Sequence, residues 1–423
     1  MWSQRLLLLS IFLLPWQTLW IFSVATIGGT PVPYGRFSLY GTQILLLLAA
    51  ALRGRAEYRV DSRFVIQGGF FILAAEFFSL AFTPFFKIGL AHALQLVFAF
   101  VLLSLLLDMR TDLKRVAFAF ISGLVISAGL GFWQVIIGSS SAATLFGLSA
   151  QHAADLGTAV VETTSGRMLR AYGSFPHPNI FGGYLAVSLL TLGWLLRFMR
   201  TRLALWVFAI PVVILVSAFI LTFSRGTWLA FAIASVVLFV QMGLYRRLPS
   251  RRAIGMIGLG AITVFSIAFL FNDQIFARLT AHGRIETISI IERTSQYADF
   301  RDLFLSHPIF GVGAGGYVFA LSRVHPGGQA FNYQPVHNAF ALVAGELGLV
   351  GLAAVLYLIF CIARLWRTSK KTAGGIFSLS LGATLIVISL FDHYLFSLWP
   401  GLALVVLVIA FIVQWSQTFM EQS

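Results

Sequence analysis

The sequence predicts an all-α polytopic membrane protein with about 12 transmembrane helices. The chain of 423 residues is 59% hydrophobic and 10% charged, with a mean hydropathy of +0.89. A soluble domain carries about 25% charged residues, so a soluble globular protein is excluded. The apolar residues lie in long stretches, and a helix satisfies its own backbone hydrogen bonds in lipid. The basic residues lie in short connectors between those stretches, as the positive-inside rule requires of a multi-pass protein.

Twelve apolar stretches have roughly the 17–25 residues that a helix needs to cross a bilayer. They cover residues 6–27, 37–52, 64–82, 88–107, 116–137, 180–196, 203–222, 227–244, 253–271, 338–362, 375–391 and 396–413. The first stretch, Leu6–Ile27, has no small-residue cleavage site, so it is interpreted as an anchor and not as a signal peptide. The chain shows no internal repeat, and we expect residues 1–423 to form one transmembrane domain.

The basic residues predict the orientation of the helices. Nineteen of the 29 are Arg5 and the basic residues of five short connectors, near 53–63, 110–115, 197–202, 246–252 and 364–371. By the positive-inside rule these connectors and both termini are cytoplasmic. The net charge of +14 therefore reflects orientation, and its scatter over many connectors predicts no nucleic-acid partner. The other ten basic residues are expected outside: Arg36, Lys87, Arg167, Arg170, Arg225, Arg278, Arg284, Arg293, Arg301 and Arg323.

Two outer connectors are long enough to carry function. They are residues 138–179 and the 66 residues of 272–337. Within the second, Gly283–His307 is predicted to be helical, with Tyr297, Phe300 and Phe304 on its apolar face. This pattern is typical of an amphipathic helix lying on the outer leaflet, or of a loop packed over the helix bundle. The glycine-rich segment 311–316 that follows is interpreted as a flexible turn.

Two predicted helices begin beside arginines on the outer side. Arg170 and His177 precede Asn179, a natural N-cap of the sixth span, and helix N-termini attract anions. Ser224 is placed to cap the eighth span. Arg225 then falls in its first turn, where the helix dipole disfavours a cation, and this favours a negative partner. For the sixth span, the alternative is an ordinary cap with an interfacial arginine. For the eighth span, the alternative is that Arg225 pairs with a loop carboxylate or extends to the lipid headgroups.

His337 and Asn338 precede the tenth span on the same side. A neutral imidazole at pH 7 can take a proton from a hydroxyl group, although a lone histidine is usually a capping or interfacial residue. On the predicted surface helix, Arg293 and Arg301 lie just over two turns apart. The alternative for these two arginines is a solvated face that is neutralised by neighbouring carboxylates.

Together these groups predict a site for a diphosphate. Two or three guanidinium groups beside helix N-termini suit that ligand, and a histidine beside the leaving group suits attack by an alcohol. Asp299 and Asp302 have no convincing metal shell around them, so neither a metal nor another cofactor is predicted. Asp392 and His393 end the eleventh span and could orient a site residue. Gly345, Gly348 and Gly351 are interpreted as a smooth face for helix packing.

These residues resemble the O-antigen ligase and polymerase superfamily of integral-membrane glycosyltransferases. His337-Asn338, followed nine residues later by Gly348 and then by Gly351, is similar to the ligase signature. Arg301 and Leu305 look like the family's Arg-x-x-x-Leu element. The segment from Arg170 to Asn179 and the Ser224–Gly226 turn look like two further family elements. The similarity covers most of the chain and is densest from Arg170 to Gly351.

The resemblance implies a GT-C-like fold with a catalytic outer loop, in a bacterial inner membrane. It implies metal-independent, inverting transfer of a glycan from undecaprenyl diphosphate to an acceptor hydroxyl, with lipid A–core as the usual acceptor, at the periplasmic face. His337 would be the base. Arg170, Arg225, Arg293 and Arg301 would bind the diphosphate, with His177, Asn179 and Asn338 in support. A polymerase of the same superfamily stays an alternative, and so does a flippase or exporter of lipid-linked oligosaccharides, which needs a cationic cavity.

Overall fold

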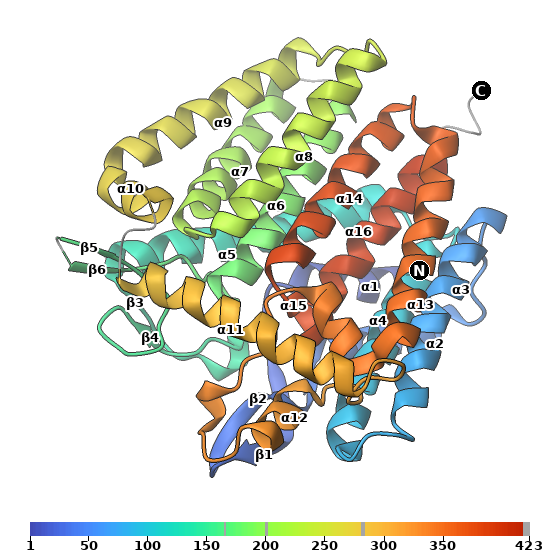
Figure 1. Cartoon of the computed structure of the whole chain (residues 1–423). Coiled ribbons are helices and arrows are strands. Elements are labelled where there is room, and N and C mark those ends of the chain that lie inside the picture. Colours follow the sequence, from blue (N-terminus) through green and yellow to red (C-terminus); the bar gives the residue numbers. More distant parts are fainter. Residues whose placement is uncertain (165, 199–201, 281–283, 418–423) are drawn as a thin grey trace.

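The computed structural model describes residues 1–164, 166–198, 202–280 and 284–417. Its fold is a bundle of helices with three small two-stranded antiparallel sheets at its edge (Figure 1). The described residues hold eight helices long and apolar enough to cross a membrane: α4 (Phe86–Leu107), α5 (Leu113–Ile137), α6 (Pro178–Leu195), α8 (Arg225–Leu244), α9 (Arg251–Leu270), α13 (Ala339–Ser369), α14 (Ala373–Phe391) and α16 (Trp399–Gln417). The protein is thus an all-α polytopic membrane protein, and eight of the predicted spans coincide with these helices.

The predicted number of twelve spans is not confirmed. Three apolar helices of the described part are shorter: α1 (Trp2–Leu13), α2 (Gly41–Arg53) and the Trp206–Leu221 part of α7 (Arg202–Leu221). A further helix, α3 (Val60–Ser79), carries Asp61, Arg63 and Glu76 and does not belong to the eight. Arg200 and Gly283, which the sequence placed in a basic connector and at a helix start, lie outside the described residues.

The first predicted span, 6–27, is wrong. Helix α1 ends at Leu13, and the chain then forms a hairpin of β1 (Leu19–Ile27) and β2 (Thr30–Tyr40). Its two-residue turn is Gly28-Gly29, whose φ values of 57° and 78° suit the tight hairpin turns that need glycine. The start of the second predicted span, 37–52, is wrong for the same reason, because residues 37–40 belong to β2. Hydropathy alone cannot separate an apolar strand from an apolar helix.

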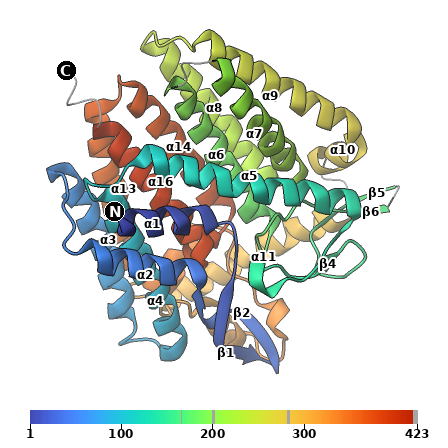
Figure 2. The same ribbon diagram turned by 180° about the vertical axis from the view of Figure 1, so that it is seen from behind.

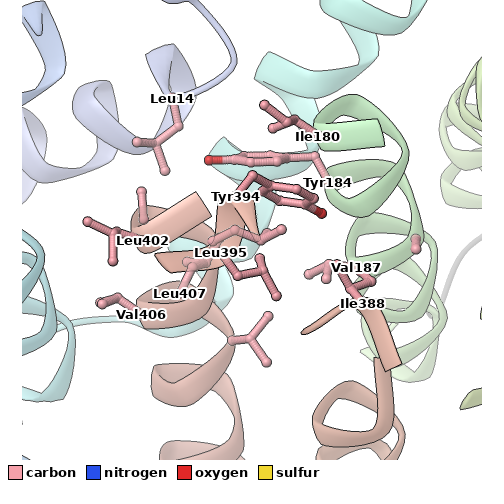
Figure 3. Packing of buried hydrophobic residues seen from close by; sticks show 14 of the residues in the cluster. Leu14, Ile180, Tyr184, Val187, Ile388, Tyr394, Leu395, Leu402, Val406 and Leu407 are labelled. Carbon is pink, nitrogen blue, oxygen red and sulfur yellow. The ribbon is translucent and has the colours of Figure 1, made fainter. Parts of the chain in front are cut away.

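The core joins the N-terminal half of the bundle to its C-terminal half. Tyr184 and Val187 of α6 pack against Ile388 of α14 and against Tyr394 and Leu395 of the short helix α15 (Tyr394–Ser397), as Figure 3 shows. The Tyr184 hydroxyl group donates to the Pro400 carbonyl group over 2.7 Å. Seen from behind in Figure 2, α5 crosses the bundle, and it packs against α6. Helix α6 is thereby fixed against α14, α15 and the start of α16.

Both long connectors are folded. The first contains β3 (Ser139–Ser140), η1 (Thr144–Phe146), β4 (Gln151–His152), β5 (Val160–Thr163) and β6 (Gly166–Leu169), and a short turn, η2 (Leu196–Phe198), follows α6. The second contains α10 (Asn272–Thr280), α11 (Arg284–Ser306), α12 (Tyr317–Val324) and η3 (Ala330–Asn332). Figure 1 shows α11 lying across one end of the bundle. The predicted helix over 283–307 is thus confirmed from Arg284 onward.

The inward face of α11 differs from the predicted apolar face. Gln296 and Leu303 are buried, and Arg293 and Phe300 are half-buried, at spacings of three, four and three residues along one side of the helix. Tyr297, expected on the apolar face, is 44% exposed. The helix therefore packs over the bundle with a face that is polar towards its beginning and apolar towards its end.

The glycine-rich segment 311–316 is not a free turn, contrary to the prediction. It is largely buried and bonded to α13: Val312 N–H donates to the Gly345 carbonyl group and Gly313 N–H to that of Glu346, both over 2.9 Å. Those carbonyl groups are accessible because α13 breaks at Gly348, with φ 64° and ψ −159°. A Cβ atom there would lie 2.2 Å from the Ile309 carbonyl oxygen. Gly348 is needed for this backbone conformation and close approach, and not for a smooth helix face as predicted.

Candidate functional site

His337 lies at the start of α13, directly under α11. Its Nδ1 is 2.7 Å from Oε1 of Gln296. A carbonyl oxygen only accepts hydrogen bonds, so Nδ1 carries the proton and Nε2 keeps its lone pair. Within the described part of the chain, no group hydrogen-bonds to Nε2. Burial lowers the pKa of His337, and although Asp392 opposes this effect, the net pKa stays below its ordinary value. The ring is therefore a neutral base at pH 7, and its accepting nitrogen has no protein partner in the described residues.

Asp392 and His393, at the junction of α14 and α15, lie beside that ring. The His337 and His393 rings meet edge to face with centroids 5.4 Å apart, and Tyr34 of β2 packs on His393 in the same manner at 5.5 Å. Burial lowers the pKa of His393 to about 4. Burial raises the pKa of Asp392, but the nearby His393 and His337 rings and the Asn179 amide outweigh it, so the carboxyl group is ionised. The site thus holds one negative charge beside two neutral imidazoles.

A chain of hydrogen bonds connects Asp392 to a buried arginine. The Asn179 side chain donates to Oδ2 of Asp392 over 2.9 Å and accepts from Nη2 of Arg170 over 2.9 Å. Nε of Arg170 donates to the Thr222 carbonyl oxygen over 2.7 Å. Arg170 is 6% exposed, so this guanidinium group fixes the start of α6 against the α7–α8 turn.

The predicted N-cap of α6 is shifted by two residues. His177, and not Asn179, caps the helix, because its Nδ1 accepts the Asn179 backbone N–H over 3.1 Å and Pro178 occupies the first helical position. Burial lowers the pKa of His177 to about 3, with Arg170 acting in the same direction. The Asn179 side chain is thereby free to join Arg170 to Asp392.

The backbone of the turn between α7 and α8 is strained, and two arginines lie beside it. Phe223 has φ 48°, which is uncommon for a bulky residue, and its carbonyl oxygen accepts from Nε and Nη2 of Arg278 over 3.1 and 2.9 Å. Arg225 is half-buried in the first turn of α8, where Nη1 approaches the Arg278 carbonyl oxygen at 3.5 Å. Arg225 and Arg278 therefore form a cationic pair at an outer helix start, and strained backbone of this kind concentrates at functional sites.

Of the remaining predicted site residues, Arg293 and Asn338 lie near His337, whereas Arg301 does not. Arg293 lies close enough to act on the pKa of His337, and it is half-buried. Arg301 does not join this cluster, because it is exposed and pairs with its neighbour Asp302 at 2.8 Å. Asn338 caps α13 through the Ala341 N–H, and its amide group donates to the Tyr297 hydroxyl group over 3.3 Å. Asn338 thus attaches α11 to the start of α13.

Sequence reasoning missed Gln296, Tyr34 and the role of Arg278, and it named Asp392 and His393 as able to orient a site residue without counting them in the site. Gln296 lies 41 residues from His337, and no local pattern relates the two. The pair Gly28-Gly29 between β-branched runs was a usable hairpin pattern, and it would have placed Tyr34 on a strand. Among the described residues, no group of three or more His, Cys, Asp or Glu side chains is arranged to hold a metal ion.

A family model described as O-antigen ligase matches residues 210–356, which run from α7 to α13 and include Arg225, α11 and His337. No curated protein sequence matches the chain. The family match supports membership of the O-antigen ligase superfamily, so the resemblance drawn from the motifs is confirmed. The match and the apolar helices support a multi-pass membrane protein with a glycosyltransferase-like ligase or polymerase role.

Proposed function

We propose, from its place in the O-antigen ligase superfamily, that the protein is an inverting, metal-independent glycosyltransferase of the bacterial inner membrane with a GT-C-like fold. The donor is a glycan on undecaprenyl diphosphate, and the acceptor is a hydroxyl group of lipid A–core at the periplasmic face. The site is formed by the 138–179 and 272–337 connectors together with the outer ends of α6, α8, α13 and α14. Support comes from the family match and from the residues that surround His337.

The proposed step is a single displacement. Nε2 of His337 takes the proton of the acceptor hydroxyl group as its oxygen attacks the anomeric carbon. The bond between that carbon and the diphosphate oxygen breaks, and the diphosphate leaves with the electron pair. Arg225 and Arg293 stabilise the charge that develops on the leaving group, and Asp392 stabilises the imidazolium that forms. The proton then passes from His337 to solvent.

One observation carries the assignment of the base. The Gln296 carbonyl oxygen fixes the tautomer of His337, so the lone pair that a base needs is on Nε2. A capping histidine would use its ring nitrogens on the helix start, as His177 does at α6. Asn338 performs that capping task for α13 instead. The capping alternative for His337 is therefore disfavoured by the contacts.

Purified protein with a lipid-diphosphate glycan and separate acceptors tests this proposal. We expect His337→Ala to bind donor normally and to lose roughly 100- to 10,000-fold in turnover per folded molecule. His307→Ala is the matched control, because His307 is an exposed histidine of the same connector, directly after α11. Arg225→Lys should bind donor more weakly, because lysine lacks the bidentate fork. Near-normal turnover of His337→Ala would remove His337 from the mechanism.

The same assay separates the alternatives. A single addition to lipid A–core indicates a ligase, and a ladder of longer lipid-linked glycans indicates a polymerase. Movement of the donor between leaflets without any change in product size would indicate a flippase.

A further inference from the structure

A second site lies in the membrane-spanning part, away from His337. A cavity of about 1200 Å³ opens between α6, α7, α8, α9 and α14. Its walls are mostly apolar, with Phe231 and Phe239 on α8 and Met256 and Gly260 on α9. Helix α9 stands at the edge of the bundle and packs on α7 (Figures 1 and 2). Pockets for drug-sized ligands have volumes of roughly 300–1,000 Å³, so this one has room for a longer chain.

Five arginines line one end of this cavity. They are Arg197, Arg246, Arg247, Arg251 and Arg252, in η2, in the α8–α9 connector and at the start of α9. None of the residues found to line the cavity is Asp or Glu. Both views show the α8–α9 connection at the end of the bundle opposite α11. This end is the one that the positive-inside rule assigns to the cytoplasm, so the arginines face the opposite side from the proposed catalytic site.

We propose that this cavity binds an anionic phospholipid of the cytoplasmic leaflet. Its phosphate headgroup lies among the arginines, and an acyl chain fills the apolar space between α8 and α9. Basic pockets between transmembrane helices on the cytoplasmic side suit such headgroups, and guanidinium groups bind phosphate in bidentate fashion.

The charge distribution decides between this lipid and the chain of the glycan donor. A donor used at the outer face has its diphosphate beside Arg225, and its polyprenyl chain gains nothing from a cationic inner end. Five guanidinium groups beside one cavity favour a ligand whose charge is at that inner end. The exclusion of the donor chain rests on the proposed function, whereas phospholipid binding at the inner end can be measured without turnover.

The test measures lipid retention by the purified full-length protein with native mass spectrometry. The probes are phosphatidylglycerol and phosphatidylcholine with the same acyl chains. We expect the triple variant Arg246→Gln, Arg247→Gln, Arg251→Gln to bind phosphatidylglycerol on the order of 100-fold more weakly, because the loss of each cation weakens binding by about fivefold. The matched control removes three exposed cations from the same face outside the cavity, with Arg367→Gln, Lys370→Gln and Lys371→Gln. It should change binding less than about threefold.

A second variant tests the cavity itself. A Cβ atom on Gly260 would have only Val216 Cγ2 nearby, at 4.0 Å, so Gly260→Phe fills the space without a backbone clash. We expect this variant to fold and to lose phosphatidylglycerol. Equal retention of the two phospholipids, equal effects of the two triple variants, or unchanged binding in Gly260→Phe would overturn the proposal. Displacement of phosphatidylglycerol by an uncharged polyprenol at equal concentration would also overturn it and would assign the cavity to the donor chain.

Discussion

The hydrogen bond between Gln296 and His337 is a sensitive test of the proposed chemistry. In Gln296→Glu, a carboxylate replaces the amide that now accepts the Nδ1 proton over 2.7 Å. An opposite charge at that distance stabilises the imidazolium form, so the pKa of His337 rises by roughly 1–3 units. A base works only when it is unprotonated. The acidic limb of the pH–rate profile should therefore move to higher pH.

Gln296→Leu removes the acceptor with little change in volume. Loss of a neutral hydrogen bond costs about 0.5–1.5 kcal/mol, which corresponds to roughly a 2- to 13-fold loss in rate. The acidic limb should stay below pH 6.5, because burial still lowers the pKa of His337. The leucine and glutamate variants thus differ in the position of the limb and not only in the rate.

The assay is turnover with saturating donor between about pH 5 and 9, divided by the amount of folded protein. Ser295→Ala is the control on the neighbouring position, since the Ser295 hydroxyl group is exposed and donates to the Glu292 carbonyl group of its own turn. An acidic limb at the same pH in Gln296→Glu and in the parent protein would refute the assignment of His337 as the base.

Three further predictions concern stability and orientation. Burial lowers the pKa of His393 to about 4, so the unfolded chain binds the extra proton below about 6.5, and this group should remove about 3 kcal/mol of stability as the pH drops from 6.5 to 4. Because burial also lowers the pKa of His177 to about 3, the thermal midpoint of His393→Gln should still fall over this range, but less than that of the parent protein; an equal fall would contradict this cause. Gly348→Ala should lower the unfolding midpoint strongly, because a φ of 64° costs about 1–3 kcal/mol for a non-glycine residue and the new Cβ atom would clash with a backbone oxygen. An unchanged midpoint would contradict the role given to this break in α13. In a Cys361→Ser background, Ser295→Cys should react with an impermeant thiol reagent from outside and Leu248→Cys only after permeabilisation, and the reverse pattern would invert the topology.

The local composition of the sequence determined most of the helices. Most of the long apolar runs form helices, and eight predicted spans correspond to membrane-length helices of the structure. The prediction from composition failed at residues 6–27, because an apolar strand has the same hydropathy as an apolar helix. Helix caps are local as well, and Asn338 was therefore placed correctly at the start of the tenth span.

Only the tertiary structure decided which polar groups meet. Gln296 and Asp392 are 41 and 55 residues from His337, and each comes from an element whose rotation about its own axis depends on packing. Rotation of α11 turns Gln296 inward and leaves Arg301 paired with Asp302 at the surface, although both residues are polar in the sequence. Hydropathy reports whether a segment favours apolar surroundings, whereas the direction of one side chain follows from the shapes that pack around it. For that reason the sequence could identify His337 as a candidate base, but not the groups that set its tautomer and its pKa.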